Sequence, residues 1–415
     1  MNDVMIHRDS CRLCGGRDYH LILRLAPTPI ADAYVPALEG PRKQESHQLD
    51  LYLCATCGHA QLLDVIDPAV LYRDYIYVTT SSMGLSDHFK GYARHVVEKL
   101  KSAPRTLVVD IGSNDGTLLG HFQVLGLRGL GVEPAHEIAR AATQSGVETQ
   151  PEFFTPRLAA SLRASHGPAG LITMNNLFAN IDDLQGTVAG VRDLLAPDGV
   201  FVFETFYFLD YLQNLVFDFM YHEHLSYFTV RPLQRFFASL GLELFDLERV
   251  STKGGSLRCF VQHMGGPRVA TPVVAERAAE EEALDLQNPH SELFQTFRAR
   301  IETQRSLVMA ELARLRAEGK RIAGYGASAT TTTLIYHFGI TDQIDYLIDD
   351  NPAKQNTLSP GCHLPVHDST AVTALKPDVI LILAWRYSDA IMAQQQAFRE
   401  RGGRFLIPLP ECRLI

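Results

Sequence analysis

Short hydrophobic runs that end in glycine-containing turns, each followed by an amphipathic stretch, recur along the middle of this chain. The run at 106–110 leads through such a turn into a helix that we expect to begin near Thr117. Further strands are expected at 129–134, 170–174 and 200–204. Alternation of buried strands with helices is typical of an open, doubly wound α/β sheet.

Local signals refine the second half of this region. A helix is expected over 182–195, and Pro-Asp-Gly at 197–199 predicts a turn after it. Gly241 is expected to stop the next helix, and a glycine turn at 252–256 should lead into a final strand.

A second α/β pattern occupies the C-terminal third. A strand at 321–325 runs into Gly-x-Gly-x-x-Ala at 324–329, and more strands are expected at 344–350, 378–383 and 403–408. Such a loop can hold the phosphates of a nucleotide, or it can be the turn of an empty scaffold. This motif alone does not decide between the two.

A chain of 415 residues is expected to form two or three domains. The stretch 271–318, rich in Ala, Glu, Arg and Leu, predicts one or two connecting helices that Pro289 interrupts. We therefore expect a small N-terminal domain at 1–70, a central domain at 71–270, and connecting helices with a C-terminal domain at 271–415.

Four of the seven cysteines form two Cys-x-x-Cys pairs, Cys11 with Cys14 and Cys54 with Cys57. Two thiolates on one tight turn can reach the same ion, and four thiolates leave no coordination position open for substrate or water. The spacing therefore predicts a structural Zn²⁺ site. The alternative is two unrelated pairs of buried cysteines.

Composition narrows the classes of partner. The net charge is −9 and the pI is near 6.0, so the chain lacks the basic field that gathers nucleic-acid phosphates. The N-terminus has no apolar run of the length that a signal peptide core needs, and no later run approaches the length of a membrane span. We therefore expect a cytoplasmic protein that acts on a small substrate, as a monomer or weak homo-oligomer.

The first glycine turn predicts a cofactor site. Its spacing is Asp-x-Gly-x-x-x-Gly rather than the Gly-x-Gly-x-x-Gly that cradles a pyrophosphate, and an acid follows about twenty residues later, where a ribose is held. This favours S-adenosylmethionine over NAD. The expected cofactor-binding residues are Asp110, Gly112, Asn114, Asp115, Gly116, Glu133, Pro134, Asn175 and Asn176.

The segment Tyr-His-Glu-His-Leu-Ser-Tyr-Phe at 221–228 gathers two imidazoles, a carboxylate and two phenols. Histidine titrates near neutrality, and a neighbouring carboxylate or phenol tunes it, so this density predicts proton transfer. The alternative is a helix start with solvated polar residues. Lys253 and Arg258 could hold an anionic substrate or form a solvated face.

On these residues the chain resembles the sugar C-methyltransferases, which methylate C3 of nucleotide-linked 4-keto deoxysugars. The resemblance spans the whole chain and rests on the cysteine pairs and on VVDIGSNDGTLL with GVEPA, NNLFANIDDL, YHEHLSYF, GGSLRCFV, GYGASATTTTL, IDDNPAKQ and LILAWRY. It implies an N-terminal zinc-binding domain, a central class I (Rossmann-like) methyltransferase domain and a C-terminal Rossmann-like α/β domain. The last would help to hold a dTDP- or GDP-type keto-sugar.

The resemblance also implies roles for single residues. His224 corresponds to the base that removes the C3 proton, Tyr221 and Glu223 line the same site, and either Tyr75 or Tyr77 reaches it. The expected substrate contacts are Lys253, Gly255, Arg258, Tyr325 and Lys354.

Two positions depart from the family pattern. Asn180 stands where relatives acting on antibiotic sugars often carry histidine, and an amide cannot take up a proton near neutrality, so His222 becomes a candidate for a second acid–base group. Threonines at 330–332 replace a Lys-Gly-Asn pattern, so nucleotide or sugar preference is expected to differ.

Two other functions compete with the methyltransferase. A nicotinamide-dependent nucleotide-sugar oxidoreductase would use the C-terminal Gly-x-Gly-x-x-Ala. A non-enzymatic zinc module would only recruit a partner. The cofactor turn, the acid after it and the histidine-rich segment favour the enzyme that uses S-adenosylmethionine.

Overall fold

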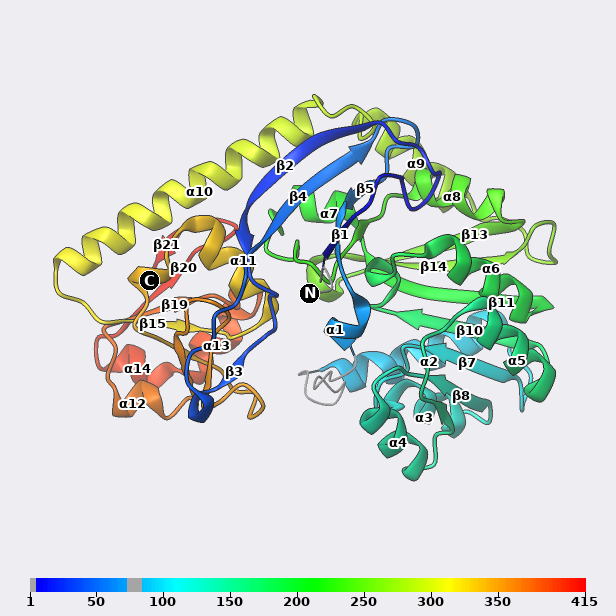
Figure 1. Ribbon diagram of the computed structural model, residues 1–415, viewed down its shortest axis with the longest axis horizontal. Coiled ribbons are helices and arrows are strands. Elements are labelled where there is room, and N and C mark those ends of the chain that lie inside the picture. Colours follow the sequence, from blue (N-terminus) through cyan, green and yellow to red (C-terminus); the bar gives the residue numbers. More distant parts are fainter. Residues whose placement is uncertain (1–4, 73–83) are drawn as a thin grey trace.

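The computed structural model describes residues 5–72 and 84–415, in which three larger sheets carry the fold (Figure 1). The central sheet has the order β13-β14-β11-β10-β7-β8-β9; β14 and β13 are antiparallel to their neighbours and the other strands are parallel. Its strands are β7 (Leu107–Ile111), β8 (Arg128–Val132), β9 (Thr149–Gln150), β10 (Ala169–Asn175), β11 (Leu195–Phe206), β13 (Leu242–Val250) and β14 (Ser256–His263).

Helices cover both faces of the central sheet, so its middle strands are hydrophobic throughout. Val108 of β7 joins a core cluster with Phe122, whereas Val109 joins the opposite cluster with Leu158 and Val188. Alternate side chains of one strand thus enter opposite layers. The helices around this sheet are α2 (Leu85–Leu100), α3 (Thr117–Val124), α4 (His136–Gln144), α5 (Pro156–His166), α6 (Leu184–Leu194), α7 (Phe208–Gln213) and α8 (Val230–Ser239).

The predicted strands and helices of this region are confirmed, with two differences. The expected turn at 197–199 lies inside β11, where the pairing with β10 shifts register; a side chain on Gly199 would come 2.8 Å from the Ala169 carbonyl oxygen. The strand β13 was not predicted. It follows Gly241, which ends α8 as expected with a φ of 75°.

A four-stranded sheet contains the two cysteine pairs and has the order β12-β5-β4-β2. Strand β12 comes from the middle of the chain and pairs antiparallel with β5. A further short pair, β1 (Met5–His7) with β6 (Asp64–Ile66), lies beside this sheet, and α1 (Pro68–Tyr72) follows. The bounds of the four strands are β2 (Tyr19–Thr28), β4 (His47–Cys54), β5 (Ala60–Leu62) and β12 (Ser226–Tyr227).

The C-terminal sheet has the order β21-β20-β19-β15-β16-β18-β17-β3, and β3 comes from the first 70 residues. The three ranges predicted as domains therefore exchange two short strands, β3 and β12. The strands are β3 (Val35–Pro36), β15 (Ile322–Tyr325), β16 (Tyr346–Ile348), β17 (Thr357–Leu358), β18 (Pro365–His367), β19 (Val379–Ile382), β20 (Arg404–Ile407) and β21 (Arg413–Leu414).

Two helices connect the central and C-terminal sheets, and Pro289 lies between them, as predicted. They are α9 (Pro272–Ala283) and α10 (Glu292–Ala317), and α10 runs as a long yellow helix along the outside of the C-terminal unit (Figure 1). The remaining helices are α11 (Ala329–Phe338), α12 (Ala371–Ala374), α13 (Ser388–Gln394) and α14 (Gln396–Glu400).

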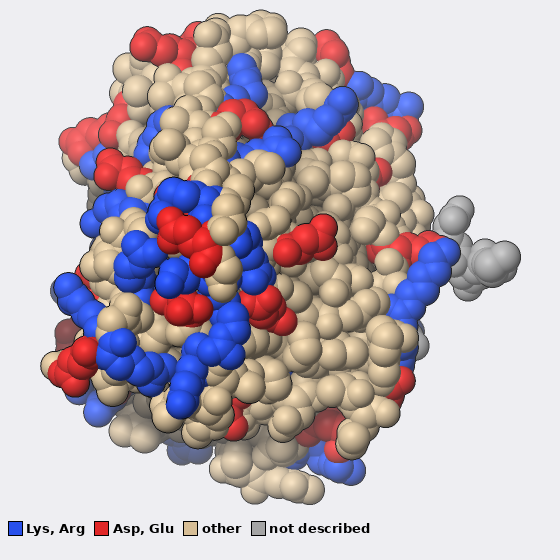
Figure 2. All heavy atoms as spheres, turned by 90° about the vertical axis from the view of Figure 1, so that its left-hand side faces the viewer, with Lys and Arg blue, Asp and Glu red and all other residues tan. Residues whose placement is uncertain are grey.

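Positive and negative side chains are interspersed on the surface shown in Figure 2. Figure 2 shows the face on the C-terminal side, where Lys and Arg side chains alternate with Asp and Glu. No helix within the described ranges is both long and apolar enough to cross a bilayer.

Candidate functional site

A cavity of about 430 Å³ lies at the carboxyl ends of β7, β8 and β10. Its size falls within the range of about 300–1,000 Å³ that is common for sites of small ligands. The edge is where ligands of open α/β sheets bind. Seven of the nine predicted cofactor residues line it: Asp110, Gly112, Asn114, Glu133, Pro134, Asn175 and Asn176.

The glycine turn after β7 shapes one wall of this cavity. Gly112 has a φ of +75°, and a side chain there would come 2.6 Å from Leu177. Only glycine therefore fits both the left-handed backbone and the narrow space. The carboxylate of Glu133 accepts hydrogen bonds from the backbone N–H groups of Asn114, at 3.0 Å, and Ala135, at 2.9 Å. Each of its oxygens keeps a lone pair for a further donor.

Burial raises the pKa of two of the acids that line the cavity, Asp110 and Glu133. Desolvation is the largest cause that raises the pKa of Asp110 to about 7, and the nearby charge of Glu133 raises it further. The Thr173 hydroxyl donates to the Asp110 carboxylate at 2.6 Å and acts in the opposite direction. Burial also raises the pKa of Glu133. Both groups are thus poised to gain from hydrogen-bond donors on a bound molecule.

The other two predicted cofactor residues, Asp115 and Gly116, do not line the cavity. The Asp115 carboxylate accepts from the N–H and hydroxyl of Thr117 at the start of α3, and Gly116 has a φ of +77° against Val147. Their roles are to cap the helix and shape the turn.

Sequence analysis missed one wall of this cavity, the segment after β9 with Phe153 and Phe154, together with Phe89 of α2. The signal for it was weak, since β9 has only two residues. It follows the third parallel strand at the same sheet edge, where ligand-contacting loops gather.

His224 is held in a fixed orientation. It does not line the cavity itself, but the charge of Lys253, which does line it, acts on the His224 ring. Its Nδ1 is 2.8 Å from the carbonyl oxygen of Phe219. A carbonyl only accepts, so Nδ1 carries the proton and Nε2 is left with the lone pair. The backbone N–H of Leu225 donates to the carbonyl of Ala179 at 2.8 Å, which joins the segment to a loop of the cavity wall.

The surroundings of His224 keep it neutral. The side chain is 5% exposed, and its ring centroid lies 4.1 Å from that of Tyr221 and 4.8 Å from that of Phe206. Burial is the main cause that lowers the pKa of His224 to about 3, and the charge of Lys253 lowers it further. The imidazole is therefore an unprotonated base near neutral pH.

Burial also shifts the pKa values of Glu223 and Lys253, two ionisable residues whose charges affect each other. Burial raises the pKa of Glu223 to about 8, with a further contribution from Asp32, while Lys354 and Lys253 oppose it. Burial lowers the pKa of Lys253 to about 8. Lys253 lines the cavity and forms no ion pair with any described residue.

His222 and Asn180 lie in different surroundings. Asn180 lines the cavity. The Nε2 of His222 donates to the carbonyl of Gln48 in β4 at 3.2 Å, and its ring packs edge-on against His47. His222 thus faces the four-stranded sheet and not the cavity.

The structure does not bring Arg258 and Gly255, which were predicted as substrate contacts, to the cavity. Arg258 is 7% exposed, and its guanidinium pairs with Glu204 at 2.6 Å and Glu248 at 3.3 Å. Its charge is used within the central sheet. Gly255 has a φ of +124° and lies so close to Asp210 that a side chain would overlap it, so it serves the backbone of the turn.

In the Gly-x-Gly-x-x-Ala loop at 324–329, at least one backbone N–H group is already hydrogen-bonded within the protein. The Ala327 N–H of Gly-x-Gly-x-x-Ala donates to the Asp349 carboxylate at 2.6 Å. Tyr325 donates its hydroxyl to Asp350 at 2.9 Å. Lys354 pairs with Asp32 at 2.6 Å. A carboxylate already occupies the position where a phosphate would approach Ala327.

The threonine run at the start of α11 ties separate regions together. Thr332 donates to the carbonyl of Ala31 at 2.8 Å, and Thr333 donates to the carbonyl of Met220 at 3.0 Å. Thr331 forms a capping box with Ser328. Tyr75 and Tyr77, which the sequence placed near the site, lie outside the described residues.

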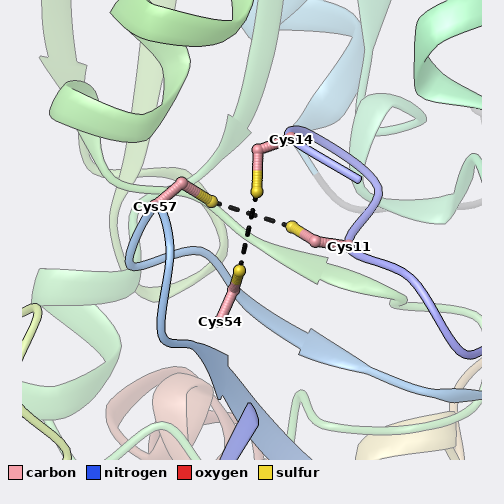
Figure 3. A group of neighbouring side chains, drawn as sticks. All are labelled: Cys11, Cys14, Cys54 and Cys57. Carbon is pink, nitrogen blue, oxygen red and sulfur yellow. Dashed lines mark hydrogen bonds between the residues drawn. The ribbon is translucent and has the colours of Figure 1, made fainter. Parts of the chain in front are cut away.

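The four cysteines of the two pairs point their sulfur atoms toward one centre (Figure 3). All four sulfurs lie within 4.8 Å of one another, with 3.7 Å between Cys11 and Cys57 and 3.6 Å between Cys14 and Cys54. Sulfurs bound at about 2.3 Å to one tetrahedral zinc ion lie about 3.8 Å apart. The set fits a structural Zn²⁺, as predicted.

Family models match almost the whole chain in three parts. They describe a zinc binding domain at residues 11–72, a methyltransferase domain at 87–247 and a C-methyltransferase C-terminal domain at 251–410. A curated relative, the C-methyltransferase NovU of Streptomyces niveus, is 33% identical over 416 residues, which cover 100% of this chain and 99% of the relative.

Solved structures match less than half of the chain, and less closely. A magnesium protoporphyrin IX methyltransferase from Synechocystis PCC 6803 is 12% identical with a TM-score of 0.34, covering 44% of this chain and 83% of that one. An S-adenosylmethionine-dependent methyltransferase from Clostridium acetobutylicum is 13% identical with a TM-score of 0.36, covering 43% and 92%. The full-length relative and the family models carry the assignment.

Proposed function

The chain belongs to the C-methyltransferase family and is an S-adenosylmethionine-dependent methyltransferase; from this premise we propose that it methylates C3 of a nucleotide-activated 4-keto deoxysugar. One observation carries the proposal most: a neutral histidine with a fixed tautomer, His224, is within range of the charge of Lys253 in the cavity wall, and its neighbour Leu225 is hydrogen-bonded to Ala179, next to Asn180 of the same wall. That combination suits removal of a proton from carbon.

The residues that line the cavity support the proposal that S-adenosylmethionine binds there. Glu133 offers acceptor lone pairs for a pair of ribose hydroxyls, and the aromatic wall at Phe153 and Phe154 offers flat apolar surface for an adenine. The amide oxygen of Asn175 accepts from the backbone N–H of Glu204 at 3.0 Å, which fixes this side chain in the cavity wall. When bound, S-adenosylmethionine supplies an electrophilic methyl group.

The residues of the chain then have distinct tasks in the proposed reaction. The ketone at C4 acidifies the C3–H bond, and Nε2 of His224 takes that proton. The electron pair left on C3 delocalises into an enolate, whose oxygen needs a cationic or hydrogen-bonding partner. Lys253 provides the cation from the cavity wall. Bound S-adenosylmethionine would supply the methyl group to this carbon and would leave as S-adenosylhomocysteine.

The proposed division of the chain follows from these tasks. The range 71–270 forms the cofactor cavity and carries the base, and 1–70 holds the zinc. The range 271–415 contacts both of the others, 1–70 through the Lys354–Asp32 ion pair and 71–270 through the hydrogen bond from α11 to Met220. Four thiolate ligands need a reducing environment, which agrees with a cytoplasmic enzyme. The alternative oxidoreductase is disfavoured, because Asp349 occupies the Ala327 N–H of the C-terminal loop.

The proposed function is tested by separating proton abstraction from methyl transfer. The purified protein is incubated in D₂O with a dTDP- or GDP-linked 4-keto deoxysugar. We expect deuterium at C3 without S-adenosylmethionine, and a gain of one methyl group with it, both followed by mass spectrometry and NMR. Binding of NADH together with no binding of S-adenosylmethionine would contradict the proposal.

Replacement of Lys253 tests the cation at the enolate. We expect Lys253→Gln to lower kcat about 100-fold with a smaller change in KM, because the lost charge acts on the developing anion. The pKa of Lys253 is lowered to about 8, so the cation is present below that pH and lost as pH rises through it. The wild-type exchange rate should therefore fall above about pH 8, whereas Lys253→Arg should extend it to higher pH.

A matched lysine provides the control for this experiment. Lys320 lies in the C-terminal unit, and its only described ion pair is a loose one with Asp378 at 3.9 Å. Lys320→Gln should leave rate and pH profile unchanged. An unaltered alkaline limb in Lys253→Arg would exclude Lys253 as its origin.

A further inference from the structure

Asp218 is a buried acid just before the histidine-rich segment, and the C-terminal unit holds it. Its side chain is fully buried at 0% exposure. The indole Nε1 of Trp385 donates to it at 2.9 Å, and the guanidinium of Arg386 donates to both of its oxygens at 3.1 Å. A buried carboxylate needs such donors, and among residues 5–72 and 84–415 those of Asp218 come from one remote segment, Trp385–Tyr387.

The next two residues of the chain are held from the same side. The Arg386 guanidinium lies 4.2 Å from the ring centroid of Phe219. The hydroxyl of Thr333 in α11 donates to the carbonyl of Met220 at 3.0 Å. Two separate elements of the C-terminal unit thus fix three consecutive residues, 218–220, through an ion pair, a cation–π contact and a hydrogen bond.

The peptide between Phe219 and Met220 is the one that orients the base. Its carbonyl oxygen, which belongs to Phe219, accepts from Nδ1 of His224 at 2.8 Å. If this carbonyl turned away, Nδ1 would lose its acceptor, and the other tautomer would put the proton on Nε2. An imidazole with its proton on Nε2 cannot take a proton there.

We propose that Arg386, with Asp218 and Trp385, is a positioning group that fixes the Phe219 carbonyl and through it the tautomer and direction of His224. The C-terminal unit thereby takes part in proton abstraction without touching the reacting atoms. This inference rests on the proposed function, because it takes His224 as the base.

A purely structural ion pair is the competing explanation. Removal of one partner of a buried pair lowers stability whatever its function, so loss of activity alone decides nothing. The two explanations differ in what happens to the His224 ring in a protein that stays folded. Only a positioning role predicts a changed tautomer with unchanged cofactor binding.

The test uses Arg386→Lys and Trp385→Phe in the full-length protein with its zinc. Lysine keeps the charge but loses the flat guanidinium that lies over the rings of Phe219 and Trp385, and phenylalanine keeps an aromatic ring but loses the donor to Asp218. We expect kcat for C3 exchange to fall about 10- to 100-fold, as for a base displaced by a fraction of an ångström. KM and the dissociation constant of S-adenosylmethionine should stay within a factor of two.

The decisive readout is ¹⁵N NMR of the His224 ring, assigned by comparison with His224→Ala. The wild type should show a protonated Nδ1 and a bare Nε2, and both variants should show a mixture of tautomers. Arg316→Lys is the matched control, because Arg316 pairs with Asp345 in the same unit at 2.8 Å without contacting residues 218–220. It should change neither rate nor spectrum.

The outcomes separate this inference from the proposed function. A wild-type tautomer and exchange rate in both folded variants would overturn the positioning role. Full exchange activity in His224→Ala would instead overturn the base. The NMR result remains decisive for positioning in either case, since it needs no turnover.

Discussion

His224→Ala should reduce C3 proton exchange and methyl transfer by about 10³-fold or more, since a positioned general base contributes roughly 10²- to 10⁴-fold. S-adenosylmethionine should bind as in the wild type, because His224 does not line the cofactor cavity. Exchange is measured in D₂O by NMR, and cofactor affinity by calorimetry. Because Nε2 is already free of its proton, acidification to about pH 5 should not remove the base in the wild type.

In the matched control, Glu133→Gln, we expect cofactor binding to be impaired and proton exchange to be retained. Glu133→Gln changes the acid of the cofactor cavity and leaves the surroundings of His224 intact. Cofactor affinity should fall while exchange without cofactor persists. If His224→Ala weakened cofactor binding and kept exchange, the assignment of the two sites would be reversed.

Removal of the zinc should abolish exchange and methyl transfer together. Structural zinc contributes about 10–16 kcal/mol in isolated zinc-finger peptides, so the four-stranded sheet should lose its order without the ion. Arg12, between two of the ligands, donates to the Leu62 carbonyl and pairs with Asp182 of the cavity wall at 3.0 Å. The loss should therefore reach the active site. Metal content, thermal unfolding and exchange are measured after treatment with a chelator.

A cysteine control distinguishes zinc loss from general thiol damage. Cys54→Ser should reproduce the chelated state, whereas Cys412→Ser, on a half-buried cysteine outside the cluster, should retain zinc and activity. Full exchange activity in a zinc-free protein would show that the base is held without this sheet.

Local features of the fold could be predicted because they are encoded over short distances. The strand at 107–111 and its glycine turn follow from a hydrophobic run and a left-handed backbone position. The zinc site follows from the spacing of its ligands. Strands β3 and β12 could not be found this way, since each has two residues and pairs with a partner that is remote in sequence.

The roles of functional residues likewise depend on contacts that are remote in sequence. Lys253 and Arg258 are equivalent in the sequence, two cations around one glycine turn, yet one lines the cavity and the other is paired within the sheet. The positions of Glu204, 54 residues away from Arg258, and of Glu248 on the neighbouring strand make that difference. Asp349 and Ala327 give a second example, because a contact across the C-terminal loop decides which N–H groups remain available.

The exchange of strands also restricts how such enzymes can be recombined. A chimera cut at residue 270 would place a new C-terminal unit against the old β3, which pairs with β17, and against the old Asp218, which needs Trp385 and Arg386. Transplanting one contiguous piece would therefore break these contacts. The grafted unit must bring residues 29–36 and 217–220 with it, so that the transferable module is a set of three separate stretches of the gene.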